Sequence, residues 1–193
     1  MNRLDFETED SMRVDVTVTF LRMDRAPTDP APALPEGVIV RRLPVCSVAL
    51  YRKLYNNVGG PWLWWLRRMM SDRDLAVHLA RHSVTIYLAE RDDKIVGFYE
   101  LDSGHWPAVN LSYFGLLPHV IGQGIGRAFL RHAVDTGFGM GARVMTVNTC
   151  TADHPQALPN YRRAGFREVR KVDEAWDIPN SLGLVPPPHL QVL

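Results

Sequence analysis

Apolar and polar residues alternate in several stretches of the chain, and this alternation predicts strands. Between Val14 and Met23 the apolar positions Val14, Val16, Val18 and Phe20 fall on one face, as in a half-buried strand. Shorter stretches rich in strand-forming residues predict six further strands, at 38–43, 84–90, 95–102, 108–117, 143–150 and 166–176. The polar residues 91–94 form a turn signal, so the strands on either side of them are predicted to form a hairpin.

Helical spacing and capping residues predict four helices. The first covers 47–58 and ends at Gly59-Gly60-Pro61, and the second runs from the Ser71/Asp74 capping pair to about residue 81. The third begins at Ile125 and is expected to end at the glycines 137, 139 and 141. The fourth covers 155–164, with Pro155 at its first position and Gly165 as its C-terminal cap. Strands and helices in this order predict an α/β protein.

The length of 193 residues suits one domain. We expect a flexible leader over residues 1–13, the domain itself over 14–177 and an extended proline-containing tail over 178–193. A further turn is expected at 104–107.

The charge balance excludes several partners. Lys and Arg total 22 against 21 for Asp and Glu, so no broad positive field exists for nucleic acid or an anionic membrane. No apolar run approaches the ~20 residues of a membrane span, and the polar start is unlike a signal peptide. Cys46 and Cys150 fit no disulfide framework or metal spacing, and the histidines show no ligand spacing, so no metal is expected. A soluble, cytoplasmic protein is predicted.

The glycines at 122, 124 and 126 lie between a predicted strand and a predicted helix. Without Cβ atoms, the N–H groups of such a segment can converge on an anion, and the helix N-terminus adds positive charge. The loop lacks the Lys and Ser or Thr of a P-loop, because Arg127 and Ala128 follow its last glycine. A dinucleotide fingerprint starting at Gly122 would need glycine at 127.

The loop instead resembles the motif (Arg/Gln)-x-x-Gly-x-(Gly/Ala) of the GNAT superfamily of acyl-CoA-dependent N-acetyltransferases. Gly124 and Gly126 take the two small positions, and Ile121 stands where the family usually has Arg or Gln. Tyr161, Gly165 and Phe166 match a second motif of the family, Tyr-x-x-x-Gly-Phe. The segment 148–161 looks like that of a bacterial subgroup whose members mostly lack assigned substrates.

The resemblance covers about residues 14–166 and implies the GNAT fold: a central mixed, mostly antiparallel twisted sheet flanked by helices and splayed at the coenzyme A site. It also implies acetyl-CoA as the donor, bound mainly by backbone groups. The expected donor-binding residues are Phe114, Gly115, Leu116, Val120, Ile121, Gly122, Gln123, Gly124, Ile125, Gly126, Arg127 and Asn148. Gly115 is expected to permit a close approach to the ligand.

By the same resemblance, Tyr161 would protonate the leaving thiolate, although a tyrosine that only packs the last helix is the alternative. Family members often carry a Glu as base near the start of the central strand, where this chain has Asn110. Glu100 on the preceding strand is therefore the candidate base, directly or through water, unless it is an ordinary solvated residue. His105, which we group with the acceptor-binding residues, and solvent are the other candidates.

Trp62, Trp64 and Trp65 lie where the family places the acceptor pocket, so their faces could receive an apolar or cationic amine. Packing in the core or at a homodimer contact is the alternative. The predicted function is direct transfer of acetyl from acetyl-CoA to a primary amine of a small molecule or peptide. A coenzyme A-binding sensor without turnover is the second hypothesis, motivated by Ile121 and Asn110.

Overall fold

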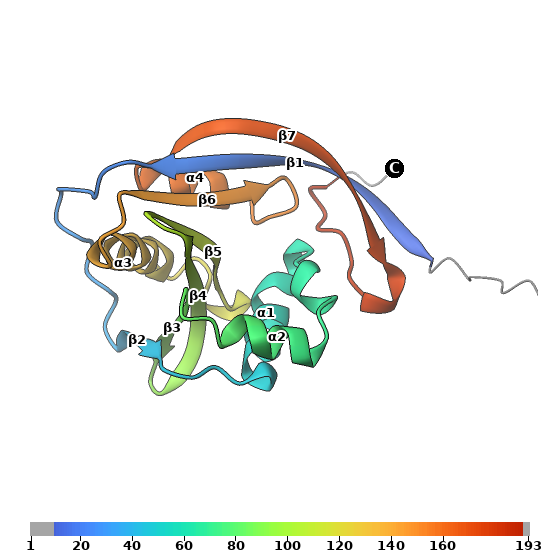
Figure 1. Ribbon diagram of the computed structural model, residues 1–193, viewed down its shortest axis with the longest axis horizontal. Coiled ribbons are helices and arrows are strands. Elements are labelled where there is room, and N and C mark those ends of the chain that lie inside the picture. Colours follow the sequence, from blue (N-terminus) through green and yellow to red (C-terminus); the bar gives the residue numbers. More distant parts are fainter. Residues whose placement is uncertain (1–9, 191–193) are drawn as a thin grey trace, which may run out of the picture.

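Seven strands form one sheet in the order β2-β3-β4-β5-β6-β1-β7 in the computed structural model, which describes residues 10–190 (Figure 1). Every neighbouring pair is antiparallel except β5 with β6, which is parallel. The strands are β1 (Ser11–Met23), β2 (Val38–Leu43), β3 (Val84–Arg91), β4 (Lys94–His105), β5 (Ala108–Leu116), β6 (Val144–Cys150) and β7 (Arg167–Pro179). The mixed, mostly antiparallel α/β architecture predicted from the sequence is thereby confirmed.

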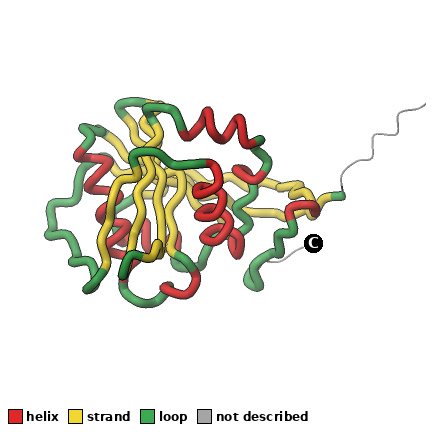
Figure 2. The backbone as a smooth tube through the Cα atoms, turned by 90° about the horizontal axis from the view of Figure 1, so that it is seen from below, coloured by secondary structure: helices red, strands yellow, loops and turns green. Residues whose placement is uncertain are grey.

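Helices cover both faces of this sheet (Figure 2). They are α1 (Val48–Gly59), α2 (Asp72–Leu79), α3 (Ile125–Gly139) and α4 (Ala157–Arg163). Tyr51 of α1 packs with Phe98 of β4 in one core cluster, whereas Phe129 of α3 packs with Tyr99 in another. Adjacent residues of a strand point to opposite faces, so α1 and α2 lie on one side of the sheet and α3 on the other.

The strands β1 and β7 form a long ribbon that arches over the molecule and extends past the rest of the sheet (Figure 1). Their pairing runs from Ser11 opposite Pro179 to Arg22 opposite Arg167. Strand β1 therefore begins inside the expected leader, and β7 continues into the expected tail, because each end gives the other its backbone partners. The leader residues 1–9 and tail residues 191–193 lie outside the described part of the chain.

Other predicted boundaries also differ from the structure. Gly137 lies inside α3 rather than at its end. The glycine there serves packing, because an added Cβ would be 2.5 Å from the Sδ atom of Met145. Helix α4 begins at Ala157, so Pro155 belongs to the preceding turn. Strand β4 extends to His105, which shortens the predicted turn at 104–107.

The parallel strands β5 and β6 separate about halfway along their length. Backbone pairing reaches Leu111 opposite Val147 and is not continued, although β5 extends to Leu116 and β6 to Cys150. At the same level β5 carries a bulge, because the β4–β5 register shifts between Glu100 and Leu101. The sheet is thus splayed as predicted, and backbone groups of both strands lack a strand partner along the opening.

Candidate active site

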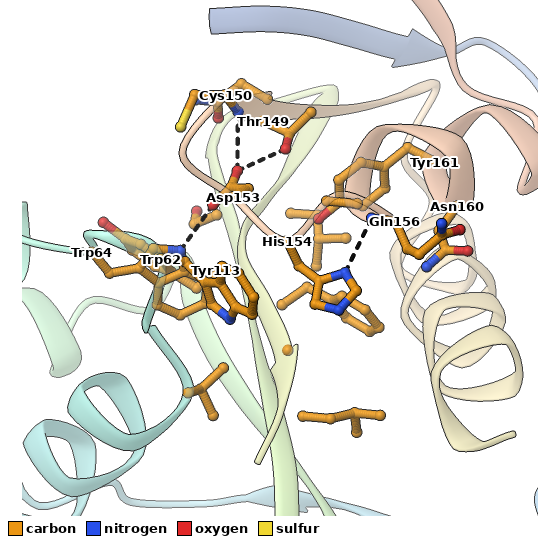
Figure 3. Close-up of a pocket in the computed structure, with 18 of the residues that line it drawn as sticks. Trp62, Trp64, Tyr113, Thr149, Cys150, Asp153, His154, Gln156, Asn160 and Tyr161 are labelled. Atoms are coloured by element: carbon orange, nitrogen blue, oxygen red, sulfur yellow. Dashed lines mark hydrogen bonds between the residues drawn. The ribbon is translucent and has the colours of Figure 1, made fainter. Parts of the chain in front are cut away.

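A cavity of about 800 Å³ lies at the splayed end of β5 and β6 (Figure 3). Its walls come from the free ends of both strands, the loop before α3, helix α4 and the turn between α1 and α2. Cavities that hold small ligands typically measure ~300–1,000 Å³. The volume therefore suits a ligand of cofactor size.

The glycine loop forms one end of the cavity. Gly122 and Gly124 have φ angles of +84° and +80°, and no atom lies within 4 Å of a Cβ built at either position. Helix α3 starts directly after Gly124, and no side chain caps it. The N–H groups of its first turn are therefore free to bind an anion.

Five of the expected loop residues line the cavity: Ile121, Gly122, Gly124, Gly126 and Arg127. The other three turn their side chains elsewhere. Val120 and Ile125 are buried in the core, and the Gln123 side chain bonds Arg91 and the carbonyl of His119. These three residues can contribute only backbone groups.

Phe114, Gly115, Leu116 and Asn148 line the splayed part of the cavity. The reason for glycine at 115 differs from the one expected. A Cβ there would be 2.4 Å from Cγ1 of Val58, so the missing side chain admits helix α1 rather than a ligand. The glycine is thus required by packing.

Tyr161 projects from α4 into the cavity (Figure 3). It is 7% exposed and packs edge-on against Phe166, with ring centroids 6.0 Å apart. Burial, with a smaller effect from the nearby Asp153 charge, raises the pKa of the Tyr161 phenol above its usual value of about 10. The phenol is therefore protonated at neutral pH, as a proton donor must be.

Neither base candidate lines the cavity. The Glu100 side chain is fully buried under α1 and α2, where it accepts hydrogen bonds from Tyr51 (2.5 Å) and Arg67 (3.1 Å) and contacts His78 (3.1 Å). His105 is exposed at the other end of β4, where it pairs with Ala108. The bulge in β5 and the two helices determine which strand residues face the opening, and Glu100 faces away from it.

The three tryptophans line the cavity and also pack against its wall, so the two interpretations of them are compatible. The Trp64 ring lies 5.0 Å from that of Tyr113 and 5.4 Å from that of Tyr55. Trp62 lies edge-on to His154 at 4.9 Å, and Trp65 is 6.4 Å from Trp176. Together these rings form a mostly aromatic wall.

Asp153 and Tyr113 are lining residues that the sequence did not single out. Asp153 follows β6 in the turn that leads to α4, and in the sequence this turn indicated only a helix start. Tyr113 sits beside the bulge in β5. Asn110 also lines the cavity, but its amide is engaged by Thr146 (2.9 Å) and bonds Ser112 (3.1 Å).

Cys150 lines the cavity near the same turn. Burial, with a smaller effect from the Asp153 carboxylate, raises the pKa of the Cys150 thiol to about 12. The reactive thiolate form is therefore scarce at neutral pH. Among the described residues, no group of three or more His, Cys, Asp or Glu side chains could hold a metal ion.

These features define a class of protein: an α/β fold whose sheet opens beside a glycine loop and an uncapped helix start. The chain belongs to the Acetyltransferase (GNAT) family, whose model matches residues 50–166. Acyl transfer is the general chemistry of this family. Within residues 10–190, no helix is both long and apolar enough to cross a membrane.

Solved structures share the fold at low sequence identity. A GCN5-related N-acetyltransferase from Sphaerobacter thermophilus is 22% identical, with a TM-score of 0.59 over 89% of this chain and 53% of that one. An aminoglycoside acetyltransferase from an uncultured soil metagenomic sample is 15% identical, with a TM-score of 0.56 over 68% and 89% of the two chains. An IAA acetyltransferase from Bacillus cereus is 21% identical, with a TM-score of 0.51 over 73% and 99%.

The chain spans about half the length of the first of these proteins. No curated protein sequence gives a significant match. At these identities the structural matches concern the fold alone, and the substrates have to be inferred from the cavity.

Proposed function

We propose that the protein is an N-acetyltransferase that binds acetyl-CoA in this cavity and transfers its acetyl group to a primary amine. One observation carries the proposal: the uncapped start of α3, preceded by two glycines with positive φ, opens on the same cavity as the protonated Tyr161. An anion site and a proton donor are what a phosphorylated thioester donor requires.

The donor would occupy the cavity along its length. The loop and the first turn of α3 would hold its pyrophosphate, with Arg127 as the cation beside it. The unpaired backbone of β5 and the Asn148 side chain would bond the pantetheine amides between the splayed strands. Ile121 lines the loop where the family usually has Arg or Gln, so one side-chain contact is absent while the backbone contacts remain.

Transfer would occur by direct attack. The neutral amine nitrogen forms a bond to the thioester carbonyl carbon, and the carbon–sulfur bond breaks. Tyr161 gives its proton to the sulfur, and the proton lost by the nitrogen returns to the phenol through solvent. The products are the acetamide and free coenzyme A. Cys150 remains a thiol, so an acetyl-enzyme intermediate is not required.

The test is release of free thiol from acetyl-CoA with a panel of primary amines, together with calorimetric binding of coenzyme A. We expect binding of the cofactor and thiol release above the blank with at least one amine. Binding without release by any amine would favour a coenzyme A sensor, which the Ile121 substitution and the engaged amide of Asn110 make the second candidate.

A further inference from the structure

The charges around the cavity are few. Among the described residues, Asp153 is the only carboxylate that lines it, and Arg67 and Arg127 are the lining residues with a fixed positive charge. Arg127 belongs to the donor loop. Arg67 Nη2 lies 3.1 Å from Glu100 Oε1 behind the aromatic wall, so its charge is already balanced. Asp153 forms no ion pair within the described chain, and its negative charge is uncompensated.

The orientation of Asp153 is fixed. Its Oδ2 atom accepts hydrogen bonds from the Thr149 hydroxyl (2.6 Å) and the Cys150 amide (3.0 Å), and its Oδ1 atom accepts one from Trp64 Nε1 (3.2 Å). A carboxylate offers about four acceptor positions. One position therefore remains on Oδ1, the oxygen that bonds Trp64 of the aromatic wall (Figure 3).

The wall beside this oxygen is apolar and rich in π-faces. The rings of Trp64 and Tyr113 are 5.0 Å apart. Trp62 also lines the cavity, edge-on to His154. Aromatic faces attract cations and also cover apolar carbon. The acidic oxygen lies at one end of the wall, and Asp153 is close enough to Tyr161 to influence the phenol electrostatically.

We propose that the acceptor is a monocationic primary amine with an aromatic or apolar body, whose ammonium binds Asp153 Oδ1 and whose body packs on Trp62, Trp64 and Tyr113. This proposal rests on the proposed function and adds the substrate class. A polyamine or an aminoglycoside would bring several charges to a cavity with one carboxylate. The bound ammonium loses one proton to solvent before the nitrogen attacks, so the transfer step is unchanged.

The experiment measures binding rather than turnover. The dissociation constants of 2-phenylethylamine, its neutral counterpart 2-phenylethanol and spermidine are determined by calorimetry with coenzyme A present. The wild-type protein should bind the amine more tightly than the other two. Asp153→Asn should weaken binding of the amine by about 10- to 100-fold, as expected for loss of a hydrogen bond to a charged group. It should weaken binding of the alcohol by less than about 3-fold.

Asp173→Asn is the matched control, because Asp173 is exposed on β7 and lies outside the cavity. It should change none of the three constants. Circular dichroism tests whether both variants fold. If Asp153→Asn does not fold, the wild-type preference for the amine over the alcohol and spermidine still tests the proposal.

Four results would each overturn the proposal. In the wild-type protein they are equal affinity for the amine and the alcohol, tighter binding of spermidine than of the amine, and no binding of the amine. In Asp153→Asn it is an equal loss of affinity for the amine and the alcohol. Failure of the proposed function gives a different result from failure of this substrate proposal. The amine would then bind through Asp153, but no amine would release coenzyme A from acetyl-CoA.

Discussion

The two ends of the cavity are built in different ways. The donor end that we propose, formed by residues 121–127, consists of backbone N–H groups from one continuous loop and the start of α3. The acceptor end that we propose consists of the side chains of Trp62, Trp64, Tyr113 and Asp153, which come from three separate segments. Backbone recognition needs only glycine and a helix start, whereas side-chain recognition can change residue by residue. The donor end thus indicates a family and the acceptor end a substrate.

The largest effect on turnover is expected for Tyr161, which lies where the donor end and the acceptor end of the cavity meet. Tyr161→Phe should lower kcat by about 10²–10⁴-fold, the usual range for loss of a general acid, with coenzyme A affinity nearly unchanged. Because the pKa of Tyr161 is raised, ionisation of this phenol should cause no fall in kcat between pH 7 and 10. Steady-state kinetics and calorimetry measure both quantities.

Tyr99→Phe is the control for Tyr161→Phe, because the Tyr99 hydroxyl bonds His132 and Thr136 beneath α3 and Tyr99 does not line the cavity. It should retain wild-type turnover. If Tyr161→Phe also did so with acetyl-CoA bound, Tyr161 would be only a packing residue.

The donor end should be sensitive to backbone conformation. Gly124 has a φ angle of +80°, which a β-branched residue adopts only with strain. Gly124→Val should therefore distort the loop and weaken coenzyme A binding by about 30-fold or more, the equivalent of two lost amide contacts. Gly139→Ala lies at the other end of α3, where no atom lies within 4 Å of a Cβ built on the glycine, so it is the control and should bind coenzyme A normally. If Gly124→Val bound coenzyme A as tightly as the wild type, the loop would not be part of the donor site.

The buried carboxylate behind the acceptor end should matter for stability. Glu100→Gln leaves Arg67 without its ionic partner, and we expect the free energy of unfolding to fall by about 2–4 kcal/mol. Glu90→Gln, on a more exposed ion pair with Arg41, should cost much less. Chemical denaturation measures both.

Kinetics separate this structural role of Glu100 from a role as base. A base would give a loss in kcat/KM concentrated below the pKa of the amine, whereas a buried structural residue would give the same factor at every pH. If the loss of kcat/KM in Glu100→Gln depended on pH in this way, Glu100 would act as the base.

The smallest effect is expected at Cys150. With its pKa raised to about 12, the thiol should react slowly with iodoacetamide at pH 7.5, and Cys150→Ser should keep kcat within about 3-fold of wild type, since thiol and hydroxyl are similar in size. Mass spectrometry after acetyl-CoA treatment should detect no acetyl group on Cys150. An acetylated Cys150 that an amine then discharges would replace direct attack by a two-step mechanism.

The geometry of the glycine loop could be predicted from the sequence because its determinants are local. Glycines at 122 and 124, the helix start at Ile125 and the motif around Tyr161 lie close to the backbone they shape. The fold class could also be predicted, from the family resemblance and the alternation of apolar residues.

The sequence predicted Trp62, Trp64 and Trp65 for the acceptor end, and they line the cavity. It did not predict Asp153 or Tyr113, because their part depends on which way side chains face. The bulge in β5 and the cover of α1 and α2 direct Glu100 into the core, and no sequence pattern reports a bulge at that level. Asp153 is significant only because Trp64, 89 positions away in the chain, donates to it. Gly115 looked like a ligand contact, and only the position of Val58 shows that it serves packing.

A crystal structure with coenzyme A and 2-phenylethylamine would test the two-ended cavity most directly. We expect the pyrophosphate on the N–H groups of residues 122–127, the sulfur beside the Tyr161 hydroxyl and the ammonium against Asp153. A pyrophosphate bound elsewhere, or a sulfur remote from Tyr161, would contradict the proposed acetyltransferase.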